Sequence, residues 1–314
     1  MLFDELRTLI LKKRNIKESS FNAYILNLKK IMDLLSVSDP KNLDFLNNPD
    51  EIISVLKDKK NSTVRNYLAS IVVFLSLYDN KKELTDKYRE LMEKYAKEYN
   101  DMIKLNEKNG SQKKNWATLK ELRDILQGYK KQLTPSLKKD ELNKKEMDLL
   151  QRYLAGMLYI GDDENPPIRN DYIMNIISKV DYDRLNEKEK KQTNYLVNQS
   201  KMKKFFSFGE YKTSGKYGIR IIPLGKTLNK VLNIWLKYNK SKHLLLNSKN
   251  EPMTANGLTK FLMKTFQPSG KDIGASMLRH IYITEKFPPQ TEEKQELADK
   301  MLHSKSQQSS YSKN

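Results

Sequence analysis

The chain of 314 residues contains no cysteine and only three histidines. The absence of cysteine excludes a disulfide framework, a thiolate zinc site and a thiol nucleophile. So few histidines also argue against a histidine-rich metal site. A metal centre built from these residue types is therefore not expected.

Long apolar stretches are missing as well. No run approaches the ~20 apolar residues that a membrane-spanning helix needs. The first residues, Met1 to Glu5, lack the basic stretch followed by an apolar one that marks a secretion signal. We therefore expect an intracellular protein, in the cytoplasm or nucleus of a host cell.

Basic residues are abundant. Lysine and arginine number 58 against 39 acidic residues, which gives a net charge of +19. The positive charge is spread over the whole length, as suits folded surfaces that contact a long polyanion. An AT-rich genome explains part of the lysine content but not the imbalance of sign. The expected partner is double-stranded DNA, and a membrane partner is not expected.

The first hundred residues predict a compact helical bundle. From Ser20 to Leu35 apolar side chains recur with a helical period, and further helices are expected at 51–56, 62–75 and 83–105. A polar stretch at 109–116 contains Gly110 and two lysines and predicts a basic linker, although an ordinary surface loop is equally compatible. The expected domains are a helical domain at 1–108, the linker at 109–116 and a second domain at 117–314.

The second domain predicts helices with one small sheet. Turn residues separate three short apolar runs, at 193–198, 204–208 and 218–223, which predict a small antiparallel β-sheet. The expected helices lie at 118–129, 139–158, 226–238, 254–266, 275–285 and 291–301. The fold class predicted for the chain is mainly α with a small antiparallel sheet, that is, α+β.

Five residues in this domain could together cut a DNA strand: Arg169, Lys212, Arg279, His303 and Tyr311. A phenol oxygen can attack phosphorus, and two guanidinium groups can hold the charge that grows on the phosphate oxygens. A lysine or histidine can protonate the departing oxygen. Each residue alone has an ordinary structural explanation, so the prediction depends on their order.

That order resembles the tyrosine recombinase (phage-type integrase) family. Arg279 stands in the run Met277-Leu278-Arg279-His280, His303 in Met301-Leu302-His303-Ser304, and Lys212 between two predicted strands. The resemblance covers residues 116–311, and the first domain is similar to the helical core-binding (SAM-like) domain of that family. It implies a catalytic domain like that of type IB topoisomerases and strand exchange through a 3′-phosphotyrosyl intermediate. It also implies a homotetramer on DNA, with no metal, ATP or other cofactor.

Two departures from the family pattern concern supporting residues. Ser276 stands where the family has a histidine, and a serine cannot supply a charge-assisted hydrogen bond. The acidic residue expected three places after Arg169 is Tyr172 here, with Asp171 one place earlier. Ser276 and Asp171 are therefore candidate supporting residues.

Other basic and hydroxyl side chains are candidate DNA contacts. Lys216 also competes with Lys212 for the role of proton donor, and Lys212 fits the family pattern better. A solvated helix end explains the remaining candidates equally well. The full set of DNA-contact candidates is Lys17, Ser62, Thr63, Arg65, Lys113, Lys114 and Lys216.

Two other functions remain open. A type IB-like topoisomerase would use nearly the same residues on a single duplex. A non-catalytic basic DNA-binding protein would explain the charge and the serine at position 276. The composition, rich in Lys and Asn, is typical of a viral or mobile element, so DNA integration is the expected biological setting.

Overall fold

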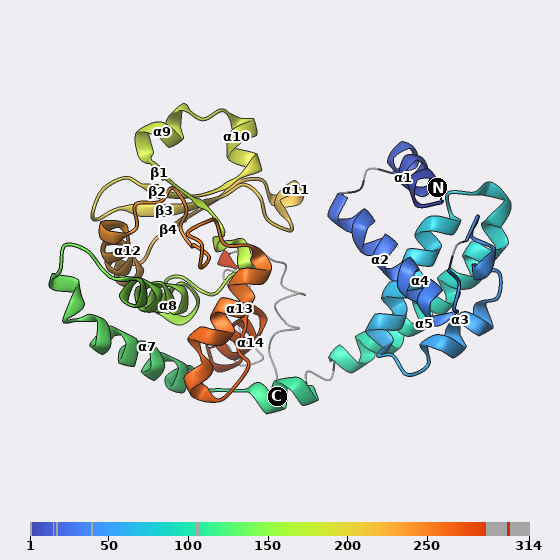
Figure 1. The fold of residues 1–314 in the computed structure, drawn as a ribbon, viewed down its shortest axis with the longest axis horizontal. Coiled ribbons are helices and arrows are strands. Elements are labelled where there is room, and N and C mark those ends of the chain that lie inside the picture. The colour runs from blue at the N-terminus through green and yellow to red at the C-terminus, as the bar shows by residue number, and fades with distance from the viewer. Residues whose placement is uncertain are drawn as a thin grey trace. The chain divides into compact units, whose positions relative to one another are not determined.

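The computed structural model describes residues 2–14, 16, 18–38, 40–104, 107–286 and 300–301. The chain divides into two compact units, residues 1–105 and 106–314. The described residues are mainly helical with one small sheet, which agrees with the expected α+β class (Figure 1). None of the helices in these ranges has the length and apolar character needed to cross a bilayer.

The first unit is helical, and each helix expected there is present. One further helix, at the start of the chain, was not among those expected. The elements are α1 (Leu2–Lys13), α2 (Glu18–Leu34), η1 (Asp44–Leu46), α3 (Pro49–Leu56), α4 (Asn61–Leu75), η2 (Asp79–Lys81) and α5 (Lys82–Lys104).

Helix α4 forms the centre of this unit. Its side chains Leu68, Ile71 and Phe74 are fully buried. Phe74 meets the rings of Phe21 and Tyr24 edge-on, with centroids 6.4 and 6.5 Å apart. Edge-to-face packing of this kind adds to the stability given by apolar burial. The apolar period in the sequence therefore identified the packed face correctly.

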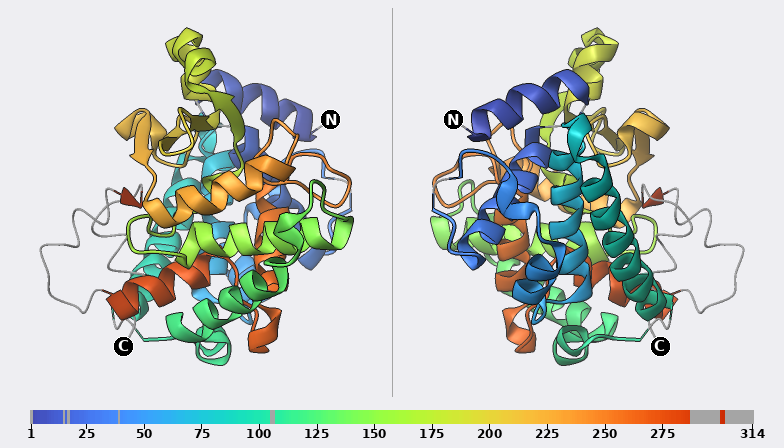
Figure 2. Two further views of the ribbon diagram at one scale, coloured as in Figure 1. Left: turned by 90° about the vertical axis from the view of Figure 1, so that its left-hand side faces the viewer. Right: turned by 90° about the vertical axis from the view of Figure 1, so that its right-hand side faces the viewer.

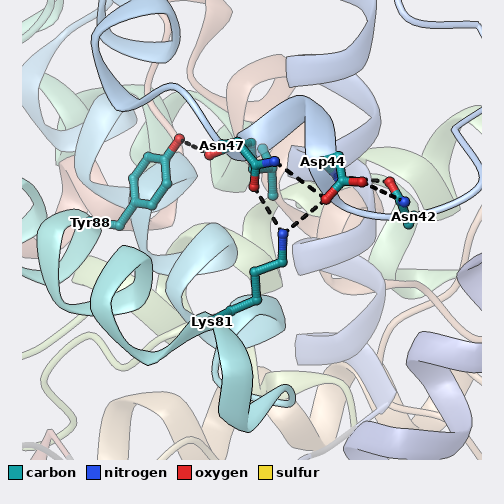
Figure 3. Close-up of polar contacts among 6 residues, drawn as sticks. Asn42, Asp44, Asn47, Lys81 and Tyr88 are labelled. Atoms are coloured by element: carbon teal, nitrogen blue, oxygen red, sulfur yellow. Dashed lines mark hydrogen bonds and ion pairs between the residues drawn. The ribbon is translucent and has the colours of Figure 1, made fainter.

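A polar network joins η1 to the start of α5 (Figure 3). The Lys81 ammonium donates to Asp44 Oδ1 and to Asn47 Oδ1, each at 2.9 Å. The buried Tyr88 hydroxyl donates to the carbonyl oxygen of Leu46 at 2.7 Å. The hydrogen bond from Lys81 is the largest influence that holds the pKa of Asp44 below its ordinary value.

The second unit contains the remaining helices and all the strands of the described chain. The α-helices are α6 (Gly110–Asn115), α7 (Leu119–Leu133), α8 (Lys144–Ile160), α9 (Lys179–Arg184), α10 (Glu187–Gln192), α11 (Ser214–Tyr217), α12 (Lys226–Tyr238), α13 (Ala255–Thr265) and α14 (Ala275–Lys286). The short 3-10 helices are η3 (Ser136–Lys138), η4 (Asn170–Tyr172) and η5 (Gln267–Ser269). The strands are β1 (Asn175–Ser178), β2 (Asn194–Asn198), β3 (Lys204–Phe208) and β4 (Arg220–Pro223). The helix expected at 291–301 falls almost entirely outside the described residues.

The stretch expected to be a linker is helical instead. Asn109 and Gln112 form a capping box, in which each side chain bonds the other residue's backbone N–H, and α6 follows. Asn115, at the end of α6, accepts a hydrogen bond from the Asp272 backbone N–H at 2.9 Å, so this helix packs on the second unit. A polar, glycine-containing stretch can be a capped surface helix as well as a loop, and its role as a linker stays a prediction.

The sheet is mixed rather than antiparallel. The described strands lie in the order β1-β2-β3-β4, and the pairs β2–β3 and β3–β4 are antiparallel, as expected. Strand β1 was not expected, and it runs parallel to β2. Parallel pairing requires a crossover connection, which α9 and α10 supply; these two helices project at the top of both views in Figure 2.

The two faces of the sheet pack against different helices. On one face Leu196, Phe206 and Phe208 belong to the main core, together with residues of α8 and α12. On the other face Tyr195 and Val197 pack with Tyr182 of α9. This alternation along β2 and β3 is the two-residue period of a strand. The sheet is therefore covered on both faces, by α9 on one side and by α8 and α12 on the other (Figure 1).

Candidate active site

Arg169 lies directly before η4 in a segment that is fixed between two helices. The Tyr159 hydroxyl of α8 donates to the Arg169 carbonyl oxygen at 3.1 Å and to Asn170 Oδ1 at 3.3 Å. The Asn170 side-chain amide donates to the carbonyl oxygen of Ala255 and to Thr259 Oγ1, both at 2.9 Å. The backbone that carries Arg169 is therefore tied to α8 on one side and to α13 on the other.

Tyr172 also holds this segment in place. Its hydroxyl donates to the Leu158 carbonyl oxygen at 2.8 Å, and its ring meets Tyr159 and Phe206 with centroids 5.3 and 5.4 Å apart. Burial raises the pKa of Tyr172 and of Tyr159 well above the ordinary value. Because a raised pKa disfavours the phenolate, these two tyrosines are structural rather than nucleophilic.

Arg279 on α14 is 5% exposed. Burial raises the pKa of Asp171, and the charges of Arg169 and Arg279 both oppose that rise. The charge of Arg279 also opposes the rise that burial causes in the pKa of Tyr159, whose hydroxyl contacts the Arg169 backbone. The charges of the two predicted arginines therefore act on the same carboxyl group.

One nitrogen of the Arg169 guanidinium lacks a hydrogen-bond partner in the described chain. This atom, Nη2, is buried. A buried donor left without an acceptor costs free energy, which a bound anion can recover. Guanidinium groups bind the oxygens of a phosphate in a planar, two-pronged geometry. The arrangement can hold a phosphate beside Asp171.

Lys212 lies in the turn after β3, between the strands where its sequence position predicts it. Its side chain is exposed, and within the described chain it has no hydrogen-bond or ion-pair partner. The preceding Tyr211 is buried, and its hydroxyl donates to the Gly218 carbonyl oxygen at 2.8 Å, which closes the loop. The rival Lys216 lies on α11 with its ammonium 5.2 Å from the centre of the Tyr217 ring. Both lysines are exposed, and the ring contact distinguishes Lys216 from Lys212.

Arg220 is a nearby cation in the sequence that was not assigned a role above. Its guanidinium lies 5.4 Å from the centre of the Tyr217 ring, and its Nε is buried without a partner in the described part of the chain. Burial raises the pKa of Tyr211, and Arg220 opposes that rise by hydrogen bonding and by charge. The charge of Asp171 also acts on Tyr211. The position of Arg220 near Lys212 in the sequence could have indicated a role, but the sequence does not show which way its side chain points.

Two of the remaining predicted catalytic and supporting residues lie in the described part of the chain. Ser276 is exposed in the first turn of α14. Asp171 is partly buried in η4. His303 and Tyr311 lie outside the described residues. The charges of Arg169 and Arg279 thus act on Asp171, and the assignments of His303 and Tyr311 stay predictions.

The predicted DNA contacts are distributed over both units. Lys113 and Lys114 are exposed on α6. In the first unit Ser62 and Thr63 lie in the first turn of α4, and the Arg65 guanidinium lies 5.2 Å from the centre of the Tyr99 ring. Lys17 lies outside the described residues. Ser62 and Thr63 lie at a helix start, as expected for that stretch, whereas Lys113 and Lys114 lie in the last turn of α6.

Within the described ranges, no group of three or more acidic or histidine side chains is placed to hold a metal ion. No family model matches the chain, and no curated protein or solved structure is similar enough to match it. The chemistry of the site must therefore be inferred from the chain's own residues.

Proposed function

We propose that the chain is a site-specific DNA recombinase of the tyrosine type, with a recombinase-like catalytic domain in its second unit. The observation that carries the proposal is the buried Arg169 Nη2, which has no partner among the described residues, together with the charges of Arg169 and Arg279 that both act on Asp171. Two guanidinium groups beside one carboxyl group, in a chain of net charge +19, form a site for a DNA phosphodiester. The exposed Lys212 lies two residues beyond Glu210, whose charge also acts on Asp171.

The proposed reaction is a phosphoryl transfer that needs no cofactor. The Tyr311 hydroxyl gives its proton to solvent water and attacks phosphorus, so that a tyrosyl O–P bond forms while the bond from phosphorus to the 5′ oxygen breaks. Arg169 and Arg279 stabilise the charge on the non-bridging oxygens. The Lys212 ammonium gives its proton to the departing 5′ oxygen, and His303 assists in binding the phosphate. A second 5′ hydroxyl then reverses the step on another strand, and the covalent intermediate conserves the bond energy.

Exchange between two duplexes requires four active sites. We propose that four copies of the chain assemble on DNA and cut strands in pairs. The first unit, with Ser62, Thr63 and Arg65 at the start of α4, would contact phosphates of the same duplex. The DNA partner and the tetramer are both part of this proposal.

The direct test is the covalent intermediate. A nicked duplex made from the DNA that flanks the coding sequence, cut so that the leaving strand diffuses away, should trap a protein–DNA adduct stable in detergent. The adduct should disappear in Tyr311→Phe and persist in Tyr67→Phe, a matched change on α4 in the first unit. Absence of an adduct with the folded parent protein, across duplexes tiling both flanks, would refute the proposal.

Two further assays separate the alternative functions. Relaxation of supercoiled plasmid without joining of two DNA molecules would identify a type IB-like topoisomerase. Salt-dependent DNA binding that is unchanged by Tyr311→Phe and Arg169→Ala, with no cleavage by the parent, would identify a non-catalytic DNA-binding protein. Ser276 in place of the family histidine is the residue that favours this last function.

A further inference from the structure

Asn194, the first residue of β2, forms a bridge between two segments of the site. Its side-chain amide nitrogen donates to the Asp171 carbonyl oxygen at 3.1 Å and to the Glu210 carbonyl oxygen at 2.8 Å. Its Oδ1 accepts from the Glu210 backbone N–H at 2.9 Å. The residue is 6% exposed, so these bonds replace contacts with water. Both donor hydrogens of the amide nitrogen are used, and the oxygen has a partner.

The two bridged segments carry different parts of the site. Asp171 follows Arg169 by two residues, and its carboxyl group lies under the influence of both arginines. Glu210 precedes Lys212 by two residues. The charge of Glu210 also raises the pKa of Asp171. The phosphate-binding segment and the lysine turn therefore meet at a single amide.

We propose that Asn194 is a positioning residue that fixes the lysine turn relative to the arginine pair. The proposal rests on the function proposed above, because it assigns the lysine turn its task in the same reaction. The bridge holds the backbone on the Asp171 side and the backbone on the Glu210 side at one hydrogen-bond length from a common group. A turn whose tip is exposed, such as the one that carries Lys212, needs such a support to keep its amine in one place.

The chemistry of the amide explains why asparagine occupies this position. A carboxylate has no donor, so aspartate would repel both carbonyl oxygens while still accepting from the Glu210 N–H. Alanine would leave two buried carbonyl oxygens and one buried N–H without these bonds. Asn194→Asp and Asn194→Ala therefore break the bridge in two different ways. The same result in both variants would assign the effect to loss of the bridge and not to misfolding of one variant.

A suitable control is Asn239, at the end of α12. It has the same 6% exposure, and its amide donates to the His243 carbonyl oxygen while its Oδ1 accepts from the Ser241 N–H, both at 2.9 Å. These bonds close a local loop and join no part of the site. Asn239→Asp and Asn239→Ala should therefore cost similar stability and leave DNA cleavage at the rate of the parent.

The first measurement is hydrogen exchange of the whole chain without DNA. In both Asn194 variants, peptides covering residues 168–173 and 209–213 should exchange faster together, because one bridge protects both. Neither peptide should change in the Asn239 variants. Faster exchange in one segment alone, or in neither, would overturn the bridge whether or not the protein cleaves DNA.

The second measurement compares two leaving atoms. Adduct formation should fall about 10²-fold in Asn194→Asp on a DNA with the ordinary 5′ oxygen, as expected for a catalytic group displaced by about 1 Å. A bridging 5′ sulfur needs no proton from the lysine, so it should restore most of that rate. Equal losses with oxygen and with sulfur would overturn the assignment of Asn194 to the lysine turn. If the parent forms no adduct, the proposed function fails while the exchange result still decides the bridge.

Discussion

Gly209, at the end of β3, allows the lysine turn to pass very close to α10. A Cβ atom added at Gly209 would overlap the carbonyl oxygen of Lys190 and would lie 2.8 Å from its carbonyl carbon. The Cα of Lys191 would be 2.9 Å away. All three atoms are backbone, so no side chain can rotate to relieve the overlap. Gly209→Ala must displace either α10 or the end of β3.

The expected cost follows from this geometry. Overpacking a filled site typically costs about 1–3 kcal/mol, and an immovable backbone obstacle places Gly209→Ala near the upper end, at about 3 kcal/mol. For a unit of this size, 1 kcal/mol corresponds to about 2–4 °C in the melting temperature, so the second unit should melt about 6–12 °C lower. The displaced turn carries Lys212, so adduct formation should fall as well.

The assay uses tryptophan fluorescence during thermal and urea unfolding. Both tryptophans of the chain, Trp116 and Trp235, belong to the second unit, so the signal reports that unit alone. The matched control is Gly215→Ala on α11, where an added Cβ meets no atom within 4 Å. That change should leave stability unchanged or raise it by about 0.4–1 kcal/mol. If Gly209→Ala unfolds with the parent, or if Gly215→Ala is the more damaging change, the close approach of the turn to α10 is wrong.

Three further changes test other parts of the molecule. Asp171→Asn should raise the melting temperature at neutral pH. The folded-state pKa of Asp171 lies above its unfolded value, so the parent loses stability as the pH rises through the folded-state pKa. The gain in melting temperature should therefore vanish in acid. A variant less stable than the parent at neutral pH would contradict this. Lys81→Met should speed hydrogen exchange in η1 near neutral pH. Because the folded-state pKa of Asp44 is depressed, the difference from the parent should disappear as the pH falls through that pKa. A difference independent of pH would count against the network. Arg279→Ala should slow adduct formation by about 10²–10³-fold, and a rate like that of the parent would remove this arginine from the phosphate site.

Strong apolar periodicity made several helices predictable from the sequence. Helix α12 has the bounds expected for it, because its buried face repeats Leu228, Val231, Leu232 and Trp235 at helical spacing. Helix α8 begins later than expected, at Lys144, because Asn143 caps it there. Such a cap competes with the apolar pattern in setting the end of a helix.

The elements that were missed lack a local signal. Strand β1 has four residues and is defined by pairing with β2 across a crossover, which no short window of sequence reveals. Helix α6 has a polar sequence and depends on a capping box at Asn109 and on the contact of Asn115 with the second unit. Both depend on residues far away in the chain or on side-chain geometry.

The same division applies to the candidate site. The order of Arg169, Lys212 and Arg279 could be recognised from the sequence, because each stands in a short run of recognisable residues. Asn194 could not be found in this way, since an asparagine at the start of a strand is common and its three hydrogen bonds connect segments 16 and 23 positions away. Arg220 was visible only as one more basic residue near the turn.

The sequence alone determined the inventory of the protein: no thiol, a large excess of positive charge, a helical first part, and a set of residues suited to phosphoryl transfer. Tertiary structure decided which of these residues meet. Arg169 and Arg279 are 110 positions apart, yet both act on Asp171, because the packing of η4 and α14 around α8 brings them together. Proximity of that kind arises from the burial of distant apolar faces, which the local order of residues does not encode.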